Sequence, residues 1–218
     1  MIWICYAVMI IVPYLLCGIN SAIIVTRIKS HEDIRNLGSG NAGLTNTLRT
    51  QGKVAALFVL LGDVLKGVLS VIAVRLAFLL IAGIDTTVYD NNLNFVAFVA
   101  ALTGILGHVF PVYFKFKGGK GILVSVSILM TVEWIPACIL LGIFIILVAI
   151  TRYVSLGSCV AAVLYGPTVL VYGLIVHDPC VYINTVIALL IGVLIVYMHR
   201  GNIVRLKNGT EKKLGQKA

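Results

Sequence analysis

Three short segments of the chain combine glycines with hydroxyl, amide and cationic side chains, which are the groups that bind phosphate. The first segment runs over residues 38–49 (GSGNAGLTNTLR). Its glycines let backbone N–H groups approach an anion closely, and the guanidinium of Arg49 is a planar fork suited to phosphate. The segment predicts an anion-binding loop, and a flexible loop with helix-capping Ser and Asn is the alternative.

The same segment matches two known nucleotide-binding patterns only in its spacing. Gly38, Gly40 and Gly43 reproduce the dinucleotide fingerprint, but an apolar run and a charged linker precede them instead of a strand. The glycines also have the spacing of a Walker loop, in which Leu44 would occupy the place of the lysine. We therefore reject both motifs and retain only the phosphate-binding chemistry that they share.

The second segment covers residues 107–121 (GHVFPVYFKFKGGKG), where three lysines alternate with glycines as an apolar run ends. This pattern predicts a cationic pocket with an accessible backbone at the start of a new helix. A positively charged membrane anchor would explain the lysines but not the glycines, which destabilise helices. His108 lies near the exit of the apolar run, where it is either functional or a hydrogen-bonded packing residue.

The third segment covers residues 199–211 (HRGNIVRLKNGTE). At helical spacing, Asn202 and Arg205 lie on about the same face as His199, and Asn208 followed by glycine predicts a turn. The alternative to a binding role is a basic tail held to anionic lipid.

The elements that must position these segments are membrane helices. Hydrophobic residues make up 60% of the chain and charged residues 11%, with a mean hydropathy of +1.07. Apolar runs of about 20 residues cross a bilayer as helices. We predict an all-α integral membrane protein whose residues 1–218 form one domain. Its first span is expected to run from Met1 to Thr26.

Charge and cysteine patterns limit the partners. The net charge of +9 comes from basic residues beside apolar runs, which is typical of contact with a lipid bilayer, and no nucleic-acid pattern is evident. The five cysteines are scattered without a Cys-x-x-Cys pair, so we expect no metal site and no disulfide framework.

The apolar run over residues 121–150 decides the topology. A turn at Glu133, Trp134 and Pro136 gives seven transmembrane helices, with the N-terminus outside and the C-terminus cytoplasmic. Every Lys and Arg outside the second span then lies on one side, as the positive-inside rule requires. The turns on the other side carry Asp85, Asp90, Glu133 and Asp178. The two spans made by the turn would have about 15 residues each, roughly 22 Å, which is short for a core of about 30 Å.

Three charged residues interrupt the second span, Lys53 to Ile84. Asp63 and Lys66 are three residues apart on one helix face and are predicted to pair. Arg75 has no partner that the sequence can name. A structural pair and a functional one are both consistent with Asp63 and Lys66.

Taken in order, the three segments resemble the motifs of the bacterial acyl-phosphate:glycerol-3-phosphate acyltransferases, the PlsY family. The family pattern is similar to Gly-Ser-Gly-Asn-x-Gly-Ala-Thr-Asn-x-x-Arg, then Gly-His-x-Phe-Pro with Phe-Lys-Gly-Gly-Lys-Gly, then His-Arg-x-Asn-Ile-x-Arg-Leu with Gly-Thr-Glu. The matching residues here are 38–49, 107–121 and 199–211, and the resemblance covers nearly the whole chain.

The resemblance implies transfer of a fatty acyl group from acyl phosphate to the 1-hydroxyl of sn-glycerol 3-phosphate, without metal or cofactor, at the cytoplasmic face of the cell membrane. The products are lysophosphatidic acid and phosphate, and the first acylation of phospholipid synthesis is the implied step. The enzyme that supplies acyl phosphate is an implied partner.

The resemblance also assigns roles to residues. The glycerol 3-phosphate site would be Lys117, Gly118, Gly119, Lys120 and Gly121. The acyl phosphate site would be Gly38, Ser39, Gly40, Asn41, Thr45, Asn46, Arg49 and Ser155. The catalytic candidates are Ser39, His108, His199 and Asn202, and the structural ones are Asp63, Lys66 and Glu211.

Two questions stay open at this point. The proton of the attacking hydroxyl could pass to His108, to His199 or to the leaving phosphate, whereas covalent catalysis through Ser39 is disfavoured because no activating base is evident. A transporter of an organic phosphate would also show several spans and cationic glycine loops, but no inverted repeat is evident. A scaffold that binds anionic lipid would explain the lysines but not the polar cluster at residues 39–49.

Overall fold

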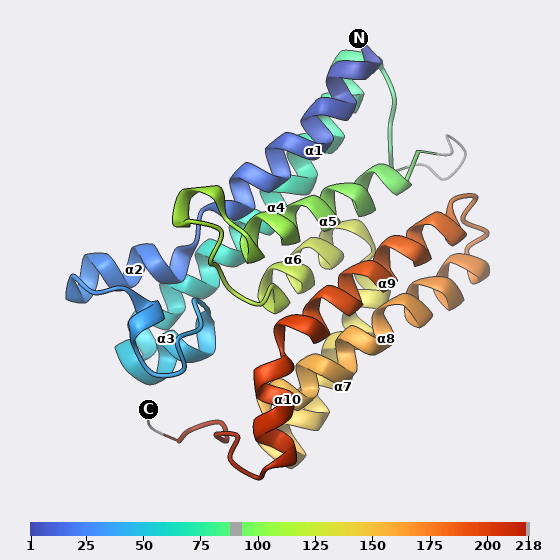
Figure 1. Ribbon diagram of the computed structural model, residues 1–218. Helices are drawn as coiled ribbons and strands as arrows, with labels where there is room; N and C mark the ends of the chain where they lie inside the picture. Colours follow the sequence, from blue (N-terminus) through green and yellow to red (C-terminus); the bar gives the residue numbers. More distant parts are fainter. Residues whose placement is uncertain (88–92, 217–218) are drawn as a thin grey trace.

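The computed structural model describes residues 1–87 and 93–216, so the predicted outer-turn residue Asp90 lies outside the described residues. The described chain is helical and contains no strand. Figure 1 shows its helices, which are α1 (Ile2–Gly18), α2 (Ser21–Ser30), α3 (Leu44–Gln51), α4 (Lys53–Ala82), α5 (Phe95–Val109), α6 (Ile122–Val132), α7 (Trp134–Thr151), α8 (Val154–Ile175), α9 (Val181–Met198) and α10 (Arg200–Lys207), with 3₁₀ turns η1 (Ile34–Asn36) and η3 (Val112–Phe114).

The all-α membrane class is confirmed. Within the described residues, 6 helical segments are long and apolar enough to cross a membrane. They are Ile2–Ser30, Lys53–Ala82, Phe95–Phe114, Trp134–Thr151, Val154–Ile175 and Val181–Met198. Helix α6 is apolar but has only 11 residues, about 16 Å at the rise of an α-helix.

The first predicted span, roughly Met1 to Thr26, lies within the apolar segment Ile2–Ser30, but the structure divides this segment into two helices, α1 and α2. Helix α1 ends at Gly18, and the buried side chain of Asn20 accepts a hydrogen bond from the N–H of Ile23 at 3.0 Å, which caps α2. An N-cap amide stabilises the start of a new helix. The chain therefore changes direction at Asn20, and α2 and α3 pack against α4 (Figure 1).

The predicted turn at Glu133 is confirmed, because α6 ends at Val132 and α7 begins at Trp134. The two helices have 11 and 18 residues, where we expected about equal lengths. Arg75 of α4 donates hydrogen bonds to the carbonyl oxygens of Thr131 at 2.7 Å and Val132 at 3.3 Å. The last carbonyls of a helix lack intrahelical partners, and a cation there is stabilised by the negative end of the helix dipole. Arg75 thus has the partner that the sequence did not reveal.

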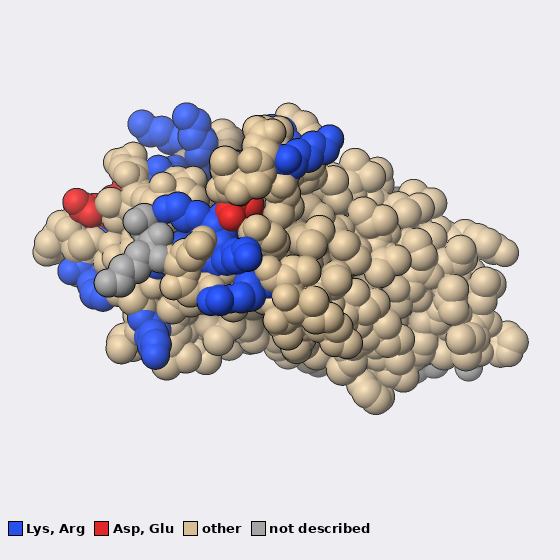
Figure 2. Space-filling model, turned by 90° about the horizontal axis from the view of Figure 1, so that it is seen from below, with Lys and Arg blue, Asp and Glu red and all other residues tan. Residues whose placement is uncertain are grey.

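The helices form two groups that meet around the predicted site. One group contains α1, α4, α5 and α6, and the other contains α7, α8 and α9, with contacts from α5 to α9 and from α6 to α7 joining them. Ile105 of α5, Ile128 of α6 and Ile191 of α9 are fully buried in the shared core. Figure 2 shows Lys and Arg side chains gathered at one end of the molecule, while the surface toward the other end shows none in this view.

Candidate active site

A cavity of about 590 Å³ lies between the two groups of helices. Its mouth is lined by the polar and charged residues Ser39, Asn41, Thr45, Arg49, His108, Lys120, Ser155, His199, Asn202, Arg205 and Glu211. Its inner arm is lined by the apolar residues Ile122, Leu123, Val126, Leu129, Ala137, Leu140, Leu141, Phe144, Ala161 and Ala162, together with Tyr165. The cavity therefore joins a cationic mouth to an apolar arm between α6, α7 and α8.

The structure brings all three predicted segments to this one cavity. The predicted site residues that line it are Gly38, Ser39, Asn41, Thr45, Asn46, Arg49, His108, Lys120, Gly121, Ser155, His199, Asn202 and Glu211. The predicted binding residues that lie outside its lining are Gly40, Lys117, Gly118 and Gly119. The sequence placed these segments on one face, and the folding of α3, α10 and the 110–121 loop brings them together.

Asn46 organises the first loop from within. Its side-chain oxygen accepts a hydrogen bond from the N–H of Ser39 at 2.9 Å. Its side-chain nitrogen donates to the carbonyl oxygens of Ile34, Leu37 and Asn41 at 3.3, 2.9 and 3.1 Å. Because Asn46 is only 2% exposed, its amide holds the shape of the loop, and Ser39 and Asn41 are presented to the cavity.

The Gly-Gly pair of the second segment also holds the loop in shape. The N–H of Gly118 donates to the carbonyl of Val109 at 3.0 Å, and the N–H of Gly119 donates to the carbonyl of His108 at 3.2 Å. A Cβ atom on Gly119 would overlap Nε2 of His108 and the carbonyl oxygen of Ala42. These glycines therefore allow a close approach of the backbone to His108, and their N–H groups are occupied by carbonyls.

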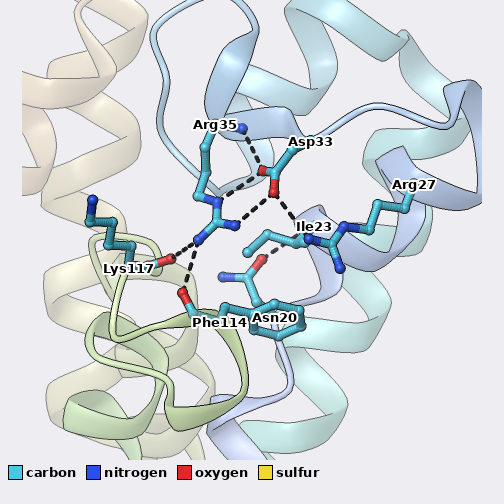
Figure 3. A network of polar contacts seen from close by, with 7 residues as sticks. All are labelled: Asn20, Ile23, Arg27, Asp33, Arg35, Phe114 and Lys117. Carbon is cyan, nitrogen blue, oxygen red and sulfur yellow. Dashed lines mark hydrogen bonds and ion pairs between the residues drawn. The ribbon is translucent and has the colours of Figure 1, made fainter.

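Arg35 connects the first loop to the second (Figure 3). Its guanidinium donates to the carbonyl oxygens of Phe114 at 2.9 Å and Lys117 at 3.1 Å, and it pairs with Asp33 at 2.7 Å. The hydrogen bond from the Arg35 side chain holds the pKa of Asp33 well below its usual range. Lys117 contributes its backbone to this network, and its side chain is exposed.

Glu211 ties the third segment to α8. Its carboxylate accepts hydrogen bonds from Ser155 at 2.7 Å, from Asn202 at 2.6 Å and from Arg205 at 2.7 Å. Burial opposes its charged form, but the hydrogen bonds from Asn202, Ser155 and Arg205 outweigh burial and lower the pKa of Glu211. The tail after α10 is thereby folded over the mouth of the cavity, where Arg49 donates to the carbonyl of Lys212 at 3.1 Å.

Lys120 supplies a partly buried positive charge to the mouth. Its ammonium donates a hydrogen bond to the side-chain oxygen of Asn202. Burial, followed by the positive charge of Arg205, lowers the pKa of Lys120 to about 8. The residue is charged at neutral pH, and a bound dianion would favour that charge further.

His199 lies at the start of α10, and the hydrogen-bond partner of its Nδ1 identifies which ring nitrogen carries the proton. Nδ1 lies 2.8 Å from the carbonyl oxygen of Ile195, and a carbonyl can only accept, so Nδ1 carries the proton. Burial lowers the pKa of His199 to about 4. The imidazole is therefore neutral at pH 7, with the lone pair on Nε2.

Asp63 and Lys66 form the predicted pair, with Nζ of Lys66 2.8 Å from a carboxylate oxygen of Asp63. The same Nζ donates to the carbonyl of Ile19 at 2.9 Å and lies 3.0 Å from Nδ1 of His108. His108 is 4% exposed and reaches the cavity. The pair in α4 is thus connected directly to a cavity residue.

Sequence reasoning missed the apolar arm. The residues of α8 that line the arm lie on one helix face, the face that begins at Ser155. They are Ser158, Ala161, Ala162 and Tyr165. These helices are apolar over most of their surface, so hydropathy alone does not distinguish the face that lines a cavity from one that contacts lipid. The small side chains on α8 were the only available signal.

The fold and the cavity together define a helical membrane protein whose cavity joins cationic and apolar surfaces. A family model described as glycerol-3-phosphate acyltransferase matches residues 7–209. The chain belongs to this family of acyltransferase enzymes.

Named relatives and solved structures agree with that family. The chain is 40% identical over 212 residues to a glycerol-3-phosphate acyltransferase of Clostridioides difficile strain 630, covering 97% of each chain. It is 38% identical over 209 residues to one of Coxiella burnetii strain CbuG_Q212, covering 96% of this chain and 98% of the relative. A crystal structure of PlsY in its glycerol 3-phosphate form matches with a TM-score of 0.77 and 31% identity, over 95% of this chain and 94% of that one.

Proposed function

We propose that this enzyme transfers a fatty acyl group from acyl phosphate to the 1-hydroxyl of sn-glycerol 3-phosphate. The hydroxyl oxygen attacks the acyl carbon, the bond from that carbon to the phosphate oxygen breaks, and the hydroxyl proton passes to a base or to the leaving phosphate. The products are 1-acyl-sn-glycerol 3-phosphate and inorganic phosphate. We place this reaction as the first acylation step of phospholipid synthesis, with the enzyme that supplies acyl phosphate as a partner.

The observation that carries this proposal is the continuity of the cationic mouth with the apolar arm. From Ser155 to Tyr165, α8 lines the cavity over a distance of about 15 Å at helical rise. Half of a hydrocarbon core of about 30 Å is also about 15 Å, which is the length of one leaflet's acyl chain. From the mouth at Ser155 to the end of the arm at Tyr165, the cavity is thus long enough for about one leaflet's length of acyl chain, with the phosphorylated head in the mouth.

Two phosphorylated substrates require several cationic and polar groups in the mouth. We assign Lys120, Arg49 and Arg205 to the two phosphate groups, because all three are cationic and line the cavity. Positive charge fixed near the leaving phosphate stabilises the charge that develops as the bond breaks. Support comes from solved PlsY structures in a glycerol 3-phosphate form and a lysophosphatidic acid form, the second at 29% identity and a TM-score of 0.72.

The same proposal includes the topology. Counting α6 gives seven membrane segments, and the end that carries the Lys and Arg side chains (Figure 2) faces the cytoplasm under the positive-inside rule. The N-terminus is then outside, the C-terminus is cytoplasmic, and the cavity mouth opens on the cytoplasmic face of the cell membrane. This orientation is tested by labelling intact cells from the outside, with a single cysteine placed at Lys213 or at Thr87. Labelling at Lys213 and protection at Thr87 would contradict the orientation.

The activity test uses purified protein with palmitoyl phosphate and glycerol 3-phosphate, and it measures phosphate release, with palmitoyl-coenzyme A in parallel. We expect release that depends on glycerol 3-phosphate and on the acyl phosphate donor. Lys120→Ala and Asn202→Ala are expected to abolish it. The matched controls are Lys207→Ala and Asn208→Ala, because both residues are exposed and lie outside the cavity lining.

Two results would contradict the proposal. Turnover of palmitoyl-coenzyme A and not of palmitoyl phosphate would mean that the donor is wrong. Absence of turnover with either donor, in folded protein that carries glycerol 3-phosphate across vesicles, would favour the transporter alternative.

A further inference from the structure

The ring of His108 is held between a buried ion pair and the glycine loop. Nδ1 lies 3.0 Å from Nζ of Lys66, and the Nε2 side lies against Gly119, where a Cβ atom would overlap it. His108 is 4% exposed and reaches the cavity. One ring nitrogen thus faces α4, while the other lies on the side of the ring next to the glycine loop, and the ring itself lines the cavity.

The charge of Lys66 determines which nitrogen carries the proton. The side chains of Lys66 and Asp63 are 7% and 3% exposed, and they pair at 2.8 Å, so the ammonium is compensated within the protein. An ammonium group has donors and no acceptor. Nδ1 of His108 must therefore accept the hydrogen bond from Lys66, and the single proton of a neutral imidazole lies on Nε2.

His199 has the opposite tautomer. Its Nδ1 donates to the carbonyl oxygen of Ile195 at 2.8 Å, which leaves the lone pair on Nε2. The two cavity histidines are thus not equivalent. His108 presents a donor, and His199 presents an acceptor.

We infer that the Asp63–Lys66 pair fixes His108 as an Nε2–H hydrogen-bond donor to a substrate oxygen and not as the base of the reaction. The inference rests on the proposed function. Lys66 and Asp63 act through His108 and are positioning residues. The proton of the attacking hydroxyl then passes to another acceptor in the mouth, either Nε2 of His199 or an oxygen of the leaving phosphate.

The direct test is the tautomer of His108 by ¹⁵N NMR of protein labelled at histidine in detergent micelles or nanodiscs. The chain has 4 histidines, and the His108 signals are assigned by their loss in His108→Gln. We expect an unprotonated Nδ1 and a protonated Nε2 in the wild type at neutral pH. A protonated Nδ1, in either the neutral or the charged ring, would overturn the inference. This measurement needs no turnover and no destabilised variant.

The second test compares two amides at position 108. The amide nitrogen of Gln reaches the place of Nε2 in histidine, whereas that of Asn reaches only the place of Nδ1. A fixed donor is worth about 10²–10³ in rate, so we expect His108→Gln to retain activity within about tenfold and His108→Asn to lose about hundredfold. An equal loss of kcat in both, as expected for a missing base, would overturn the donor role.

Lys66→Met separates positioning from general stability. Methionine keeps the shape and removes the donor to Nδ1, so the His108 ring can take the other tautomer. We expect mixed His108 tautomers and a kcat lowered about tenfold or more, as for a misaligned donor, with the KM for glycerol 3-phosphate changed less. Unchanged His108 tautomer and kcat in folded Lys66→Met would contradict the role of Lys66. If the wild type gives no turnover, the proposed function fails, while the NMR result on His108 still stands.

Discussion

Replacement of Glu211 is expected to disable the mouth of the cavity by removing the residue that holds the proposed substrate ligands Ser155 and Arg205 in place. Its carboxylate accepts hydrogen bonds from Ser155 at 2.7 Å and from Asn202 at 2.6 Å, and it pairs with Arg205 at 2.7 Å. A hydrogen bond to a charged group contributes about 1.5–3 kcal/mol. The Arg205 side chain is 42% exposed, so its share is discounted to under about 1 kcal/mol.

The two shielded hydrogen bonds therefore determine the magnitude. At the lower end they amount to about 3 kcal/mol, which corresponds to about a hundredfold in rate because 1.36 kcal/mol is tenfold. Asn202 contacts Lys120, so the loss is transmitted to a cationic group of the mouth. We expect Glu211→Ala to lower kcat/KM for glycerol 3-phosphate by about a hundredfold.

Glu211→Gln refines the test because it keeps one acceptor oxygen for Ser155 and Asn202 and turns an amide toward Arg205. Its loss is expected to be about tenfold, from the weaker neutral acceptor. Phosphate release at varied glycerol 3-phosphate measures both variants, at a temperature where thermal unfolding shows each to be folded. Activity of Glu211→Ala within threefold of the wild type would refute the reasoning, as would a larger loss in Glu211→Gln.

Three further predictions concern the arm, the mouth and the short helix α6. Ala162→Phe fills the apolar arm, so the ratio of kcat/KM for palmitoyl over octanoyl phosphate should fall by about tenfold or more, and an unchanged ratio would exclude the arm as the acyl site. The pKa of Lys120 is lowered to about 8, and its charged form is the one present below that value. The KM for glycerol 3-phosphate should therefore rise as the pH increases through about 8. If Lys120→Arg shows the same rise in KM as the wild type, the rise belongs to the titration of another group. Arg75→Met leaves the carbonyls at the end of α6 unpaired, which should lower the free energy of unfolding by about 2–4 kcal/mol. The control is the exposed Arg200→Met, and equal melting temperatures would contradict the capping role.

The class of protein and the positions of its polar segments could be predicted from the sequence. Long apolar runs specify membrane helices locally, because each helix satisfies its own backbone hydrogen bonds. Charge placement and the Glu133–Pro136 interruption predicted the break between α6 and α7, which the structure confirms. The pairing of Asp63 with Lys66 followed from a spacing of three on one helix face, and it is also confirmed.

The tertiary structure decided which polar groups are free to act. The residue types around Asn46 and Gly118 suggested phosphate ligands, but in the folded chain their donors are used by backbone carbonyls several residues away. The partner of Arg75 is a helix end distant in sequence.

The apolar arm and the tautomer of His108 also depend on tertiary contacts. Hydropathy alone does not indicate which face of a mostly apolar helix lines a cavity. That face is set by how α6, α7 and α8 pack. The proton of His108 is assigned by Lys66, which lies 42 positions away in the chain. The sequence by itself determined the helices and the chemistry available at their ends, because those properties are local. The shape of the cavity and the direction of each hydrogen bond were decided by packing between distant segments.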